Sequence, residues 1–345
     1  MIYKKPERLR AGDTVAIVSP SWGGPSCFSL VYENGLKTLR GLGLKIKEYP
    51  SARRDAGFLR ENPKFRAGDI NAAFSDPEVK AIVASIGGDD SVRLLPFLDK
   101  RVIAGNPKIL MGYSDTTALH VFLNTQGLAS FYGPSVMAGL SQAKSLPADF
   151  LEHIHKMLFE PEAAYVYAPY KEYSEGYPDW GKAENVGKVN PPRANDGWHW
   201  LQGAGTASGE LFGGCLEVLE MLKATDFWPS RDFWKGKIFF LETSEDKPPL
   251  WYIGQVLRNY GMLGVFENIN GLIFSRPMRY SSEEKEKLEQ TLLRLIAKEF
   301  GRPDLPVVAN FDIGHTDPQL IMPLGIRAEL NPSAKSVRLV ENWLS

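Results

Sequence analysis

Short apolar segments alternate with helix-like segments along the first part of the chain, and this alternation constrains the fold more than any other feature. The expected strands cover residues 14–19, 44–49, 79–86 and 109–111, and the expected helices cover residues 30–42, 62–74 and 91–98. The strand segments are almost continuously apolar, as parallel strands are when both of their faces are buried. The pattern therefore predicts an α/β fold with helices on both faces of a parallel sheet.

A second α/β unit is predicted after residue 209. The expected strands there cover residues 237–242, 270–275 and 306–310, the expected helices cover residues 215–222, 250–260 and 281–300, and residues 326–340 have the pattern of β structure. A chain of 345 residues is long for a single core. We expect an N-terminal domain over residues 1–165, a linker or loop over residues 166–208, and a C-terminal domain over residues 209–345.

The segment between the two units is rich in aromatic rings, Pro, Gly and Asn. Its rings include Tyr173, Tyr177, Trp180, Trp198 and Trp200. A stretch of this length is too long for a passive connection. Its rings either stack on a planar group of a ligand or pack between the two domains, and the pattern leaves both possibilities open.

Charge and cysteine content exclude several classes of protein. Lys and Arg total 40 and Asp and Glu total 41, so a formal net charge of −1 argues against binding to nucleic-acid polymers or to an acidic membrane surface. Cys27 and Cys215 are too few for a disulfide framework and lack metal-site spacing, so we expect buried free thiols. Neither a signal peptide nor a membrane span is visible in the pattern, which predicts a cytoplasmic location.

Ser114 lies at a predicted strand–helix turn. The apolar run before it forms the strand, and Asp115, Thr116 and the residues after them begin the helix. Such a turn exposes a hydroxyl beside free amide groups that can stabilise an oxyanion. Gly112 and Ser114 match the Gly-x-Ser half of a nucleophile elbow, although Thr116 stands where a second Gly is usual. The alternative is that Ser114 only caps the helix.

The partners for a nucleophilic serine are available at the ends of other predicted strands. His315 follows a buried strand in Gly-His-Thr-Asp-Pro, and Glu242 ends another. A serine nucleophile needs such a base and an acidic group to orient it. Gly87 and Gly88 follow a third strand, and an amide there could complete an oxyanion hole with the amide of Asp115. Taken singly, each of these features is also compatible with a turn residue or a solvated strand end.

The motifs taken together resemble one known family. They are SIGGDDS with RLLP, MGYSDTTALH, GGCLEVL, FLETSEDKP and NFDIGHT, in this order. Over residues 11–330, the chain resembles the serine peptidases that include the LD-carboxypeptidases and the microcin C immunity carboxypeptidases. The resemblance implies an N-terminal Rossmann-like domain, similar to class I glutamine amidotransferases, and a C-terminal swivelling β/α domain, with the site between them.

The same resemblance implies the roles of particular residues. Ser114 would be the nucleophile, His315 the base and Glu242 the residue that orients the base, while Gly88 and Asp115 would donate the oxyanion-hole amides. The resemblance also implies a homodimer without a metal or organic cofactor.

Two branches of the family imply different substrates. The GGDDS and LETSEDK motifs and the long Trp-bearing segment look more like the microcin-immunity branch, which cuts the amide joining an acyl or peptidyl group to a nucleotide. In that branch a Trp stacks on the base, and Trp180 is the candidate here. Candidate substrate-binding residues are Gly87, Asp89, Trp180 and Lys247.

The LD-carboxypeptidase branch instead removes terminal D-Ala from murein tetrapeptides. A third possibility, of another class, is a non-catalytic ligand-binding protein with two lobes.

Overall fold

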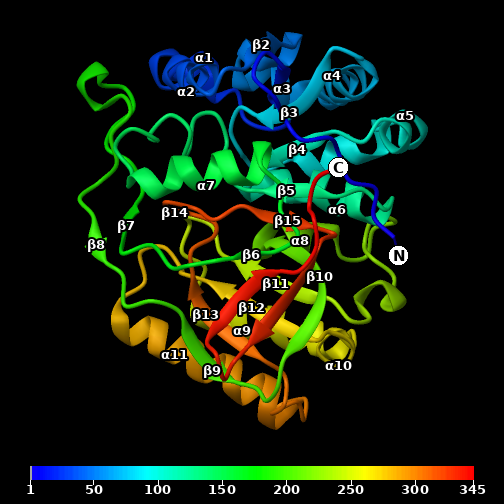
Figure 1. Ribbon diagram of the computed structural model, residues 1–345, viewed down its shortest axis with the longest axis vertical. Coiled ribbons are helices and arrows are strands. Elements are labelled where there is room, and N and C mark those ends of the chain that lie inside the picture. Colours follow the sequence, from blue (N-terminus) through cyan, green and yellow to red (C-terminus); the bar gives the residue numbers. More distant parts are fainter. Residues whose placement is uncertain (1) are drawn as a thin grey trace.

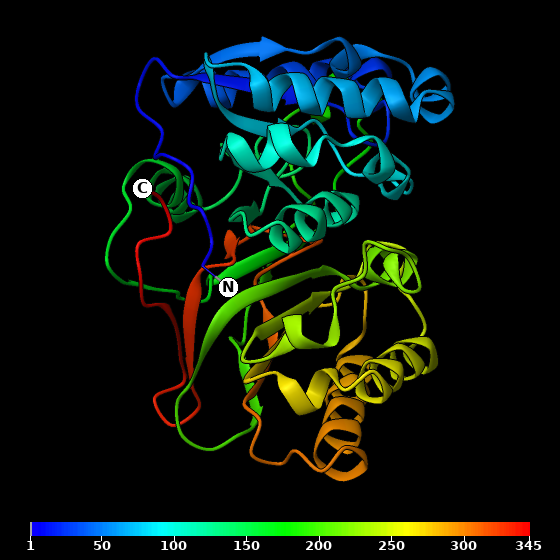
Figure 2. The same cartoon turned by 90° about the vertical axis from the view of Figure 1, so that its right-hand side faces the viewer.

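The computed structural model describes residues 2–345 and contains two α/β units, which lie one above the other in Figures 1 and 2. The N-terminal unit is built on a six-stranded sheet and the C-terminal unit on an eight-stranded sheet. The predicted α/β class with two domains is confirmed.

The N-terminal sheet has the order β15-β5-β4-β3-β1-β2. Its strands are β1 (Thr14–Val18), β2 (Lys45–Glu48), β3 (Val79–Ala84), β4 (Ile109–Gly112), β5 (Ser130–Tyr132) and β15 (Met322–Leu324). The first five are parallel, whereas β15 runs antiparallel to β5. The strand order reverses between β1 and β3. Sites in open α/β sheets lie at the carboxyl ends of the strands beside such a reversal.

Helices cover this sheet, and β1, β3 and β4 are buried at nearly every position. The helices are α1 (Gly24–Cys27), α2 (Ser29–Gly41), α3 (Ala56–Glu61), α4 (Pro63–Ser75), α5 (Lys100–Gly105), α6 (Thr117–Thr125) and α7 (Ala148–Phe159). The helix expected at residues 91–98 is a 3-10 helix, Ser91–Phe97, with Pro96 inside it. Proline has no amide hydrogen to donate, which disfavours a regular α-helix there.

The C-terminal sheet has the order β6-β17-β16-β10-β11-β12-β13-β9. Its strands are β6 (Tyr165–Val166), β9 (His199–Gln202), β10 (Ala207–Cys215), β11 (Ile238–Glu242), β12 (Gly271–Ser275), β13 (Val307–Phe311), β16 (Arg327–Asn331) and β17 (Ser336–Leu339). Strands β10 to β13 are parallel, and the strands on both sides of this core are antiparallel.

The helices of this unit are α8 (Leu216–Leu222), α9 (Leu250–Met262), α10 (Val265–Asn268) and α11 (Ser282–Leu293), which continues as a π-helix over Arg294–Glu299. Ser281 and Glu284 form a capping box at the start of α11, in agreement with the predicted start. Among residues 2–345, no helix combines the length and the apolar character needed to cross a bilayer.

The aromatic segment contains more regular structure than its composition suggests. Strands β7 (Glu172–Glu175) and β8 (Arg193–Ala194) form a small sheet with β14 (Thr316–Asp317), which directly follows His315. The segment is therefore tied by backbone hydrogen bonds to the chain that carries His315.

The two units are also joined through their cores. Strand β15 comes from the C-terminal part of the chain but completes the N-terminal sheet. The amide of Cys215 donates to the Thr117 Oγ1 atom of α6 at 2.9 Å.

The expectation for the cysteines is half correct. Cys215 is buried, but Cys27 is exposed. Cys27 ends a four-residue helix whose last positions face solvent, and so its neighbours do not cover it.

Candidate active site

Ser114 lies at a strained turn between β4 and α6. Its φ of 59° is left-handed, a conformation that is unfavourable for residues other than glycine. Its amide donates to the Tyr132 hydroxyl at 3.0 Å, and the start of α6 has no side-chain cap. The turn therefore presents the hydroxyl of Ser114 outward, as a nucleophile elbow does.

His315 lies between Ser114 and Glu242. Its Nε2 atom is 3.1 Å from Ser114 Oγ, and its Nδ1 atom is 2.7 Å from Glu242 Oε2. These three residues come from the N-terminal unit, the end of β11 and the loop between β13 and β14. The structure thus brings the three predicted residues into the hydrogen-bonded order that a serine nucleophile requires.

Glu242 is fully buried at the end of β11. A buried carboxylate must be hydrogen-bonded, and it accepts from the Tyr132 hydroxyl as well as facing His315. Gly314 packs directly against it, since a side chain there would come within 2.5 Å of Glu242 Oε2. The possibility of a solvated strand end is excluded.

His315 is in contact with a second carboxylate. Glu245 Oε2 lies 3.0 Å from the His315 Nε2 atom. Burial alone would lower the pKa of His315, but the negative charges of Glu242 and Glu245 raise that pKa well above its ordinary value. The contact with His315 in turn lowers the pKa of Glu245 to about 2.

The turn after β3 lies against Ser114. A side chain on Gly87 would come within 3.1 Å of Ser114 Oγ and 3.5 Å of the Asp115 nitrogen. Gly88 has a φ of 148°, and a side chain there would come within 2.1 Å of Ser21 Oγ. Only glycine fits at Gly88. The turn is thus close enough to Ser114 for one of its amides to donate to an oxyanion that forms beside the hydroxyl.

The carboxylate of Asp115 holds this turn in place. It accepts from the amides of Asp90 and Ser91 at 3.1 and 2.8 Å. Arg66, which is fully buried, in turn donates to both carboxylate oxygens of Asp90 at 2.7 and 3.0 Å. The Asp115 side chain does not cap α6, because its Oδ2 atom accepts these two amides.

Ser114 and His315 open into a cavity of about 640 Å³. The candidate substrate-binding residues Gly87, Asp89 and Trp180 line this cavity, and so does the oxyanion-hole candidate Gly88. Its other walls come from both units and from the aromatic segment: Trp22, Phe28, Arg60, Ile86, Tyr113, Ala138, Gly176, Tyr177, Pro178, Asp179, Glu245, Asp246, Met278 and Arg279.

Two family models match the chain. Residues 15–133 match the LD-carboxypeptidase N-terminal domain, and residues 208–330 match the LD-carboxypeptidase C-terminal domain. A probable murein peptide carboxypeptidase of Bacillus subtilis is 30% identical over 96% of this chain and 93% of its own length. The chain belongs to the LD-carboxypeptidase family.

Another relative is a microcin self-immunity protein. The microcin C7 self-immunity protein MccF of Escherichia coli is 27% identical over 98% of this chain and 96% of its own. A solved structure of MccF in complex with aspartyl sulfamoyl adenosine has a TM-score of 0.87 at 27% identity and covers 99% of this chain and 100% of that one. An MccF-like protein from Streptococcus pneumoniae, solved in complex with AMP, has a TM-score of 0.84 at 29% identity, with coverage of 95% and 98%. The chain is thus a serine-type carboxypeptidase with the two-domain fold of MccF.

The rings of the aromatic segment have different environments. Trp198 stacks on Phe311 and donates to Asp312, and Tyr173 lies under the guanidinium of Arg276. These rings pack the C-terminal unit. Tyr177 and Trp180, in contrast, line the cavity.

Lys247 is not at the cavity. Its ammonium group pairs with Glu284 of α11 at 2.8 Å, and the residue is absent from the cavity wall. The prediction that Lys247 contacts substrate is not supported by this arrangement, because the carboxylate on α11 holds the side chain away. Glu245 and Tyr132 were not among the predicted site residues. For Glu245 the only signal was its position in the polar run after β11.

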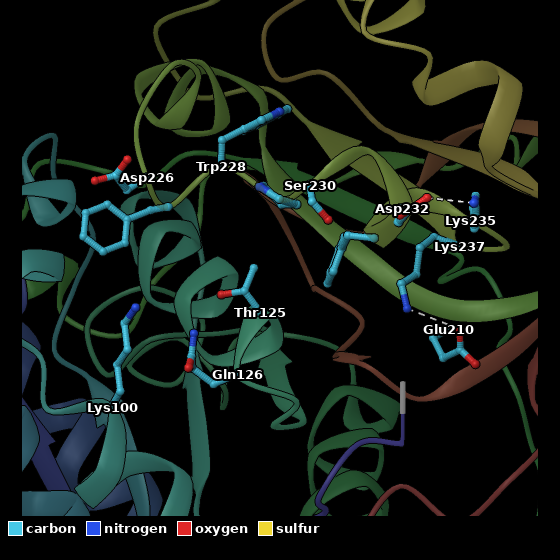
Figure 3. Close-up of a pocket in the computed structure, with 13 residues that line it drawn as sticks. Lys100, Thr125, Gln126, Glu210, Asp226, Trp228, Ser230, Asp232, Lys235 and Lys237 are labelled. Carbon is cyan, nitrogen blue, oxygen red and sulfur yellow. Dashed lines mark hydrogen bonds and ion pairs between the residues drawn. The ribbon is translucent and has the colours of Figure 1, made fainter.

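A second cavity, of about 400 Å³, lies between the units and does not include Ser114 or His315 (Figure 3). Its ammonium groups include Lys235, paired with Asp232, and Lys237, paired with Glu210. Within residues 2–345, no group of three or more His, Cys, Asp or Glu side chains is arranged to hold a metal ion.

Proposed function

We propose that this enzyme hydrolyses the amide that joins an acyl or peptidyl group to a nucleotide, through an acyl-enzyme on Ser114. The observation that carries this proposal is an aromatic wall, formed by Trp22, Phe28, Tyr177 and Trp180, in the cavity into which Ser114 opens. The complex of MccF with aspartyl sulfamoyl adenosine supports a nucleotide-linked substrate.

In this mechanism, Ser114 Oγ attacks the scissile carbonyl carbon while its proton passes to His315 Nε2. Glu242 keeps the imidazole oriented and stabilises the cation that forms. The carbonyl oxygen becomes an oxyanion that accepts hydrogen bonds from the amides of Gly88 and Asp115. His315 then gives its proton to the leaving nitrogen as the C–N bond breaks. Water, deprotonated by the same imidazole, hydrolyses the ester.

Trp180 is the proposed stacking partner for the base. Its ring lies 5.7 Å from that of Phe28 and 5.1 Å from that of Tyr177, measured between centroids. Its indole nitrogen is buried and has no hydrogen-bond partner among the described residues. The ring is thus held at the cavity wall by two other rings.

A second candidate function is the removal of terminal D-Ala from murein tetrapeptides. The 30% identity to the probable murein peptide carboxypeptidase of Bacillus subtilis favours it. Both substrates would use the same three residues, and they differ in whether a purine occupies the cavity.

A side-by-side hydrolysis assay tests the proposal. Wild-type enzyme should cleave aspartyl or glutamyl sulfamoyl adenosine faster than a murein tetrapeptide, as measured by kcat/KM. Ser114→Ala and His315→Ala should each lower kcat by about 10⁴-fold or more, because such residues act as a unit. Cleavage of the tetrapeptide alone would favour the second function. A Ser114→Ala protein with full biological effect would instead indicate a binding protein.

The stacking role of Trp180 has its own test. Base–aromatic stacking contributes about 1–3 kcal/mol, so Trp180→Ala should weaken nucleotide substrates by roughly ten- to a hundredfold. A murein peptide carries no purine and should be nearly unaffected. Equal losses on both substrates, accompanied by a lower melting temperature, would mean that Trp180 only packs between elements.

A further inference from the structure

Glu245 and Ser114 both face the same nitrogen of His315. Glu245 Oε2 is 3.0 Å from Nε2 and Ser114 Oγ is 3.1 Å from it. Glu242 occupies the other ring nitrogen at 2.7 Å. The imidazole is thus placed between two carboxylates, and the second of them is on the side where the proton of Ser114 must arrive.

This arrangement stabilises a proton on both ring nitrogens. An opposite charge at such a distance favours the charged form of the group. An imidazolium cannot accept the proton of Ser114, because Nε2 then has no free lone pair. The contact between Glu245 and His315 therefore opposes the transfer of the Ser114 proton to His315. This opposition ends when the Glu245 carboxylate moves away or pairs with another cation.

The backbone of Glu245 is held, but its side chain reaches solvent. Its side chain is 56% exposed. The preceding residue, Ser244, donates through its amide and its hydroxyl to Glu217 Oε1 at 3.0 and 2.6 Å. The carbonyl of Glu245 accepts from Arg279 Nη1 at 3.3 Å. Rotation of the carboxylate into the cavity needs no change in this backbone.

Other cations near the cavity are engaged elsewhere. Arg60 lies 3.5 Å from Asp89, and Arg279 bonds to the carbonyl of Glu245. In the part of the chain that the structure describes, His315 is the only ion-pair partner of the Glu245 carboxylate. A substrate cation could therefore pair with the Glu245 carboxylate by replacing a single ion pair, the one between Glu245 and His315 that opposes catalysis.

We propose that Glu245 is a specificity-determining residue that binds a substrate ammonium group next to the scissile carbonyl and, in doing so, releases His315 for catalysis. The proposal rests on the proposed function, since the aminoacyl end of a compound such as aspartyl sulfamoyl adenosine carries an ammonium group of this kind. The reacting carbonyl carbon must approach Ser114 Oγ to about 3–3.5 Å. The ammonium nitrogen of an aminoacyl group is two bonds from that carbon. It therefore comes close to the Glu245 carboxylate, which lies beside Nε2 as Ser114 Oγ does.

The first test compares two substrates that differ only in the amine. Aspartyl sulfamoyl adenosine with a free amine and its N-acetyl derivative are assayed with wild-type enzyme and with Glu245→Gln. The wild-type enzyme should prefer the free amine, and Glu245→Gln should lose that preference by about tenfold or more, because hydrogen bonds to charged groups are the strong ones. Glu283→Gln is the matched control, since it removes the same charge from the start of α11, outside the cavity.

The second test follows the imidazole directly and does not depend on turnover. The groups that face His315 are Glu242, Glu245, Asp317 and Tyr113, and only Glu245 is changed. Proton–nitrogen NMR of the five histidines in Ser114→Ala protein should show that Glu245→Gln lowers the pH at which His315 titrates. The acid limb of kcat/KM for the N-acetyl substrate should move in the same direction.

The outcomes separate this inference from the proposed function. If wild-type enzyme cleaves neither nucleotide substrate, the proposed function is wrong, while the NMR titration still decides whether Glu245 restrains His315. An unchanged titration in Glu245→Gln overturns the inference. So does an unchanged preference for the free amine in a folded Glu245→Gln enzyme.

Discussion

At the scale of single residues, the Tyr132 hydroxyl contacts two parts of the proposed triad. It accepts the amide of Ser114 at 3.0 Å and donates to Glu242. The ring is fully buried, which raises the pKa of this hydroxyl well above its ordinary value and keeps it a neutral donor. One side chain thus links the strained turn to the carboxylate that faces His315.

Replacement of Tyr132 by Phe should reduce both activity and stability. It leaves the amide of Ser114 and one oxygen of Glu242 without a partner, which costs about 1–3 kcal/mol for a buried group. We expect kcat to fall by about tenfold or more and urea unfolding to show the loss of stability. Tyr167→Phe is the control, because its hydroxyl donates to the Ile321 carbonyl at 2.9 Å and does not contact the triad. Equal effects of both variants on kcat would contradict this role.

At the scale of elements, the turn after β3 is packed against the turn after β4. Gly87→Ala should lower kcat by about a hundredfold or more. The added methyl group would lie about 3 Å from Ser114 Oγ and would displace the oxyanion amides. Loss of a single oxyanion donor lowers kcat by about a hundredfold or more. Folding should be nearly unchanged. Gly68→Ala, on α4 where nothing lies within 4 Å of the added methyl group, should keep full activity and gain about 0.5–1 kcal/mol. Full activity in Gly87→Ala would mean that the turn has room to move.

Helix α7 is held by a buried, neutral histidine. His153 Nδ1 is 2.7 Å from the Tyr165 hydroxyl, and its Nε2 accepts the amide of Ile321 at 2.8 Å. Burial lowers the pKa of His153 from 6.5 to about 3. The unfolded chain therefore binds this proton at a higher pH than the folded chain does.

The stability of the folded state should accordingly fall as the pH drops from about 6.5 toward about 3. His153 contributes its full stabilisation above that range and loses it progressively within it. His153→Gln cannot titrate, so the slope of unfolding free energy against pH should be smaller, as measured by urea unfolding at several pH values. His155→Gln, at an exposed position of the same helix, is the control. An unaltered slope in His153→Gln would assign the acid sensitivity to other groups.

At the scale of the whole molecule, the proposed triad exists only when the two units are held together. The hydrogen bond from the Cys215 amide to Thr117 Oγ1 is one buried contact that joins them. Thr117→Val keeps the shape of the side chain but leaves that amide without its partner, which should cost about 1–3 kcal/mol.

Thermal unfolding should show this loss as a lower Tm in Thr117→Val. Thr125→Val is the matched control on α6, since its hydroxyl donates to a carbonyl of its own helix, that of Phe122. If Thr117→Val and the control had the same Tm, the contact between the units would contribute little.

Much of this architecture was predictable because its causes are local. Apolar runs bounded by Gly and Pro indicated the strands β1, β3, β4, β11, β12 and β13 within a residue or two. Strand–helix alternation indicated parallel sheets. The turn at Ser114, the carboxylate at the end of β11 and the histidine after β13 were visible for the same reason. Each is defined by its position at the end of a strand.

Tertiary structure alone decided which strands are neighbours and which side chains meet. The placement of β15 in the N-terminal sheet, the contact of Tyr132 with Glu242 and the approach of Glu245 to His315 join parts of the chain that are far apart. Lys247 is a further example. Its ammonium group pairs with Glu284 on α11, far along the chain, and so it does not line the cavity. The sequence by itself determined the element types and the chemical groups at the strand ends. The pairing of those groups depends on packing between segments that no local pattern encodes.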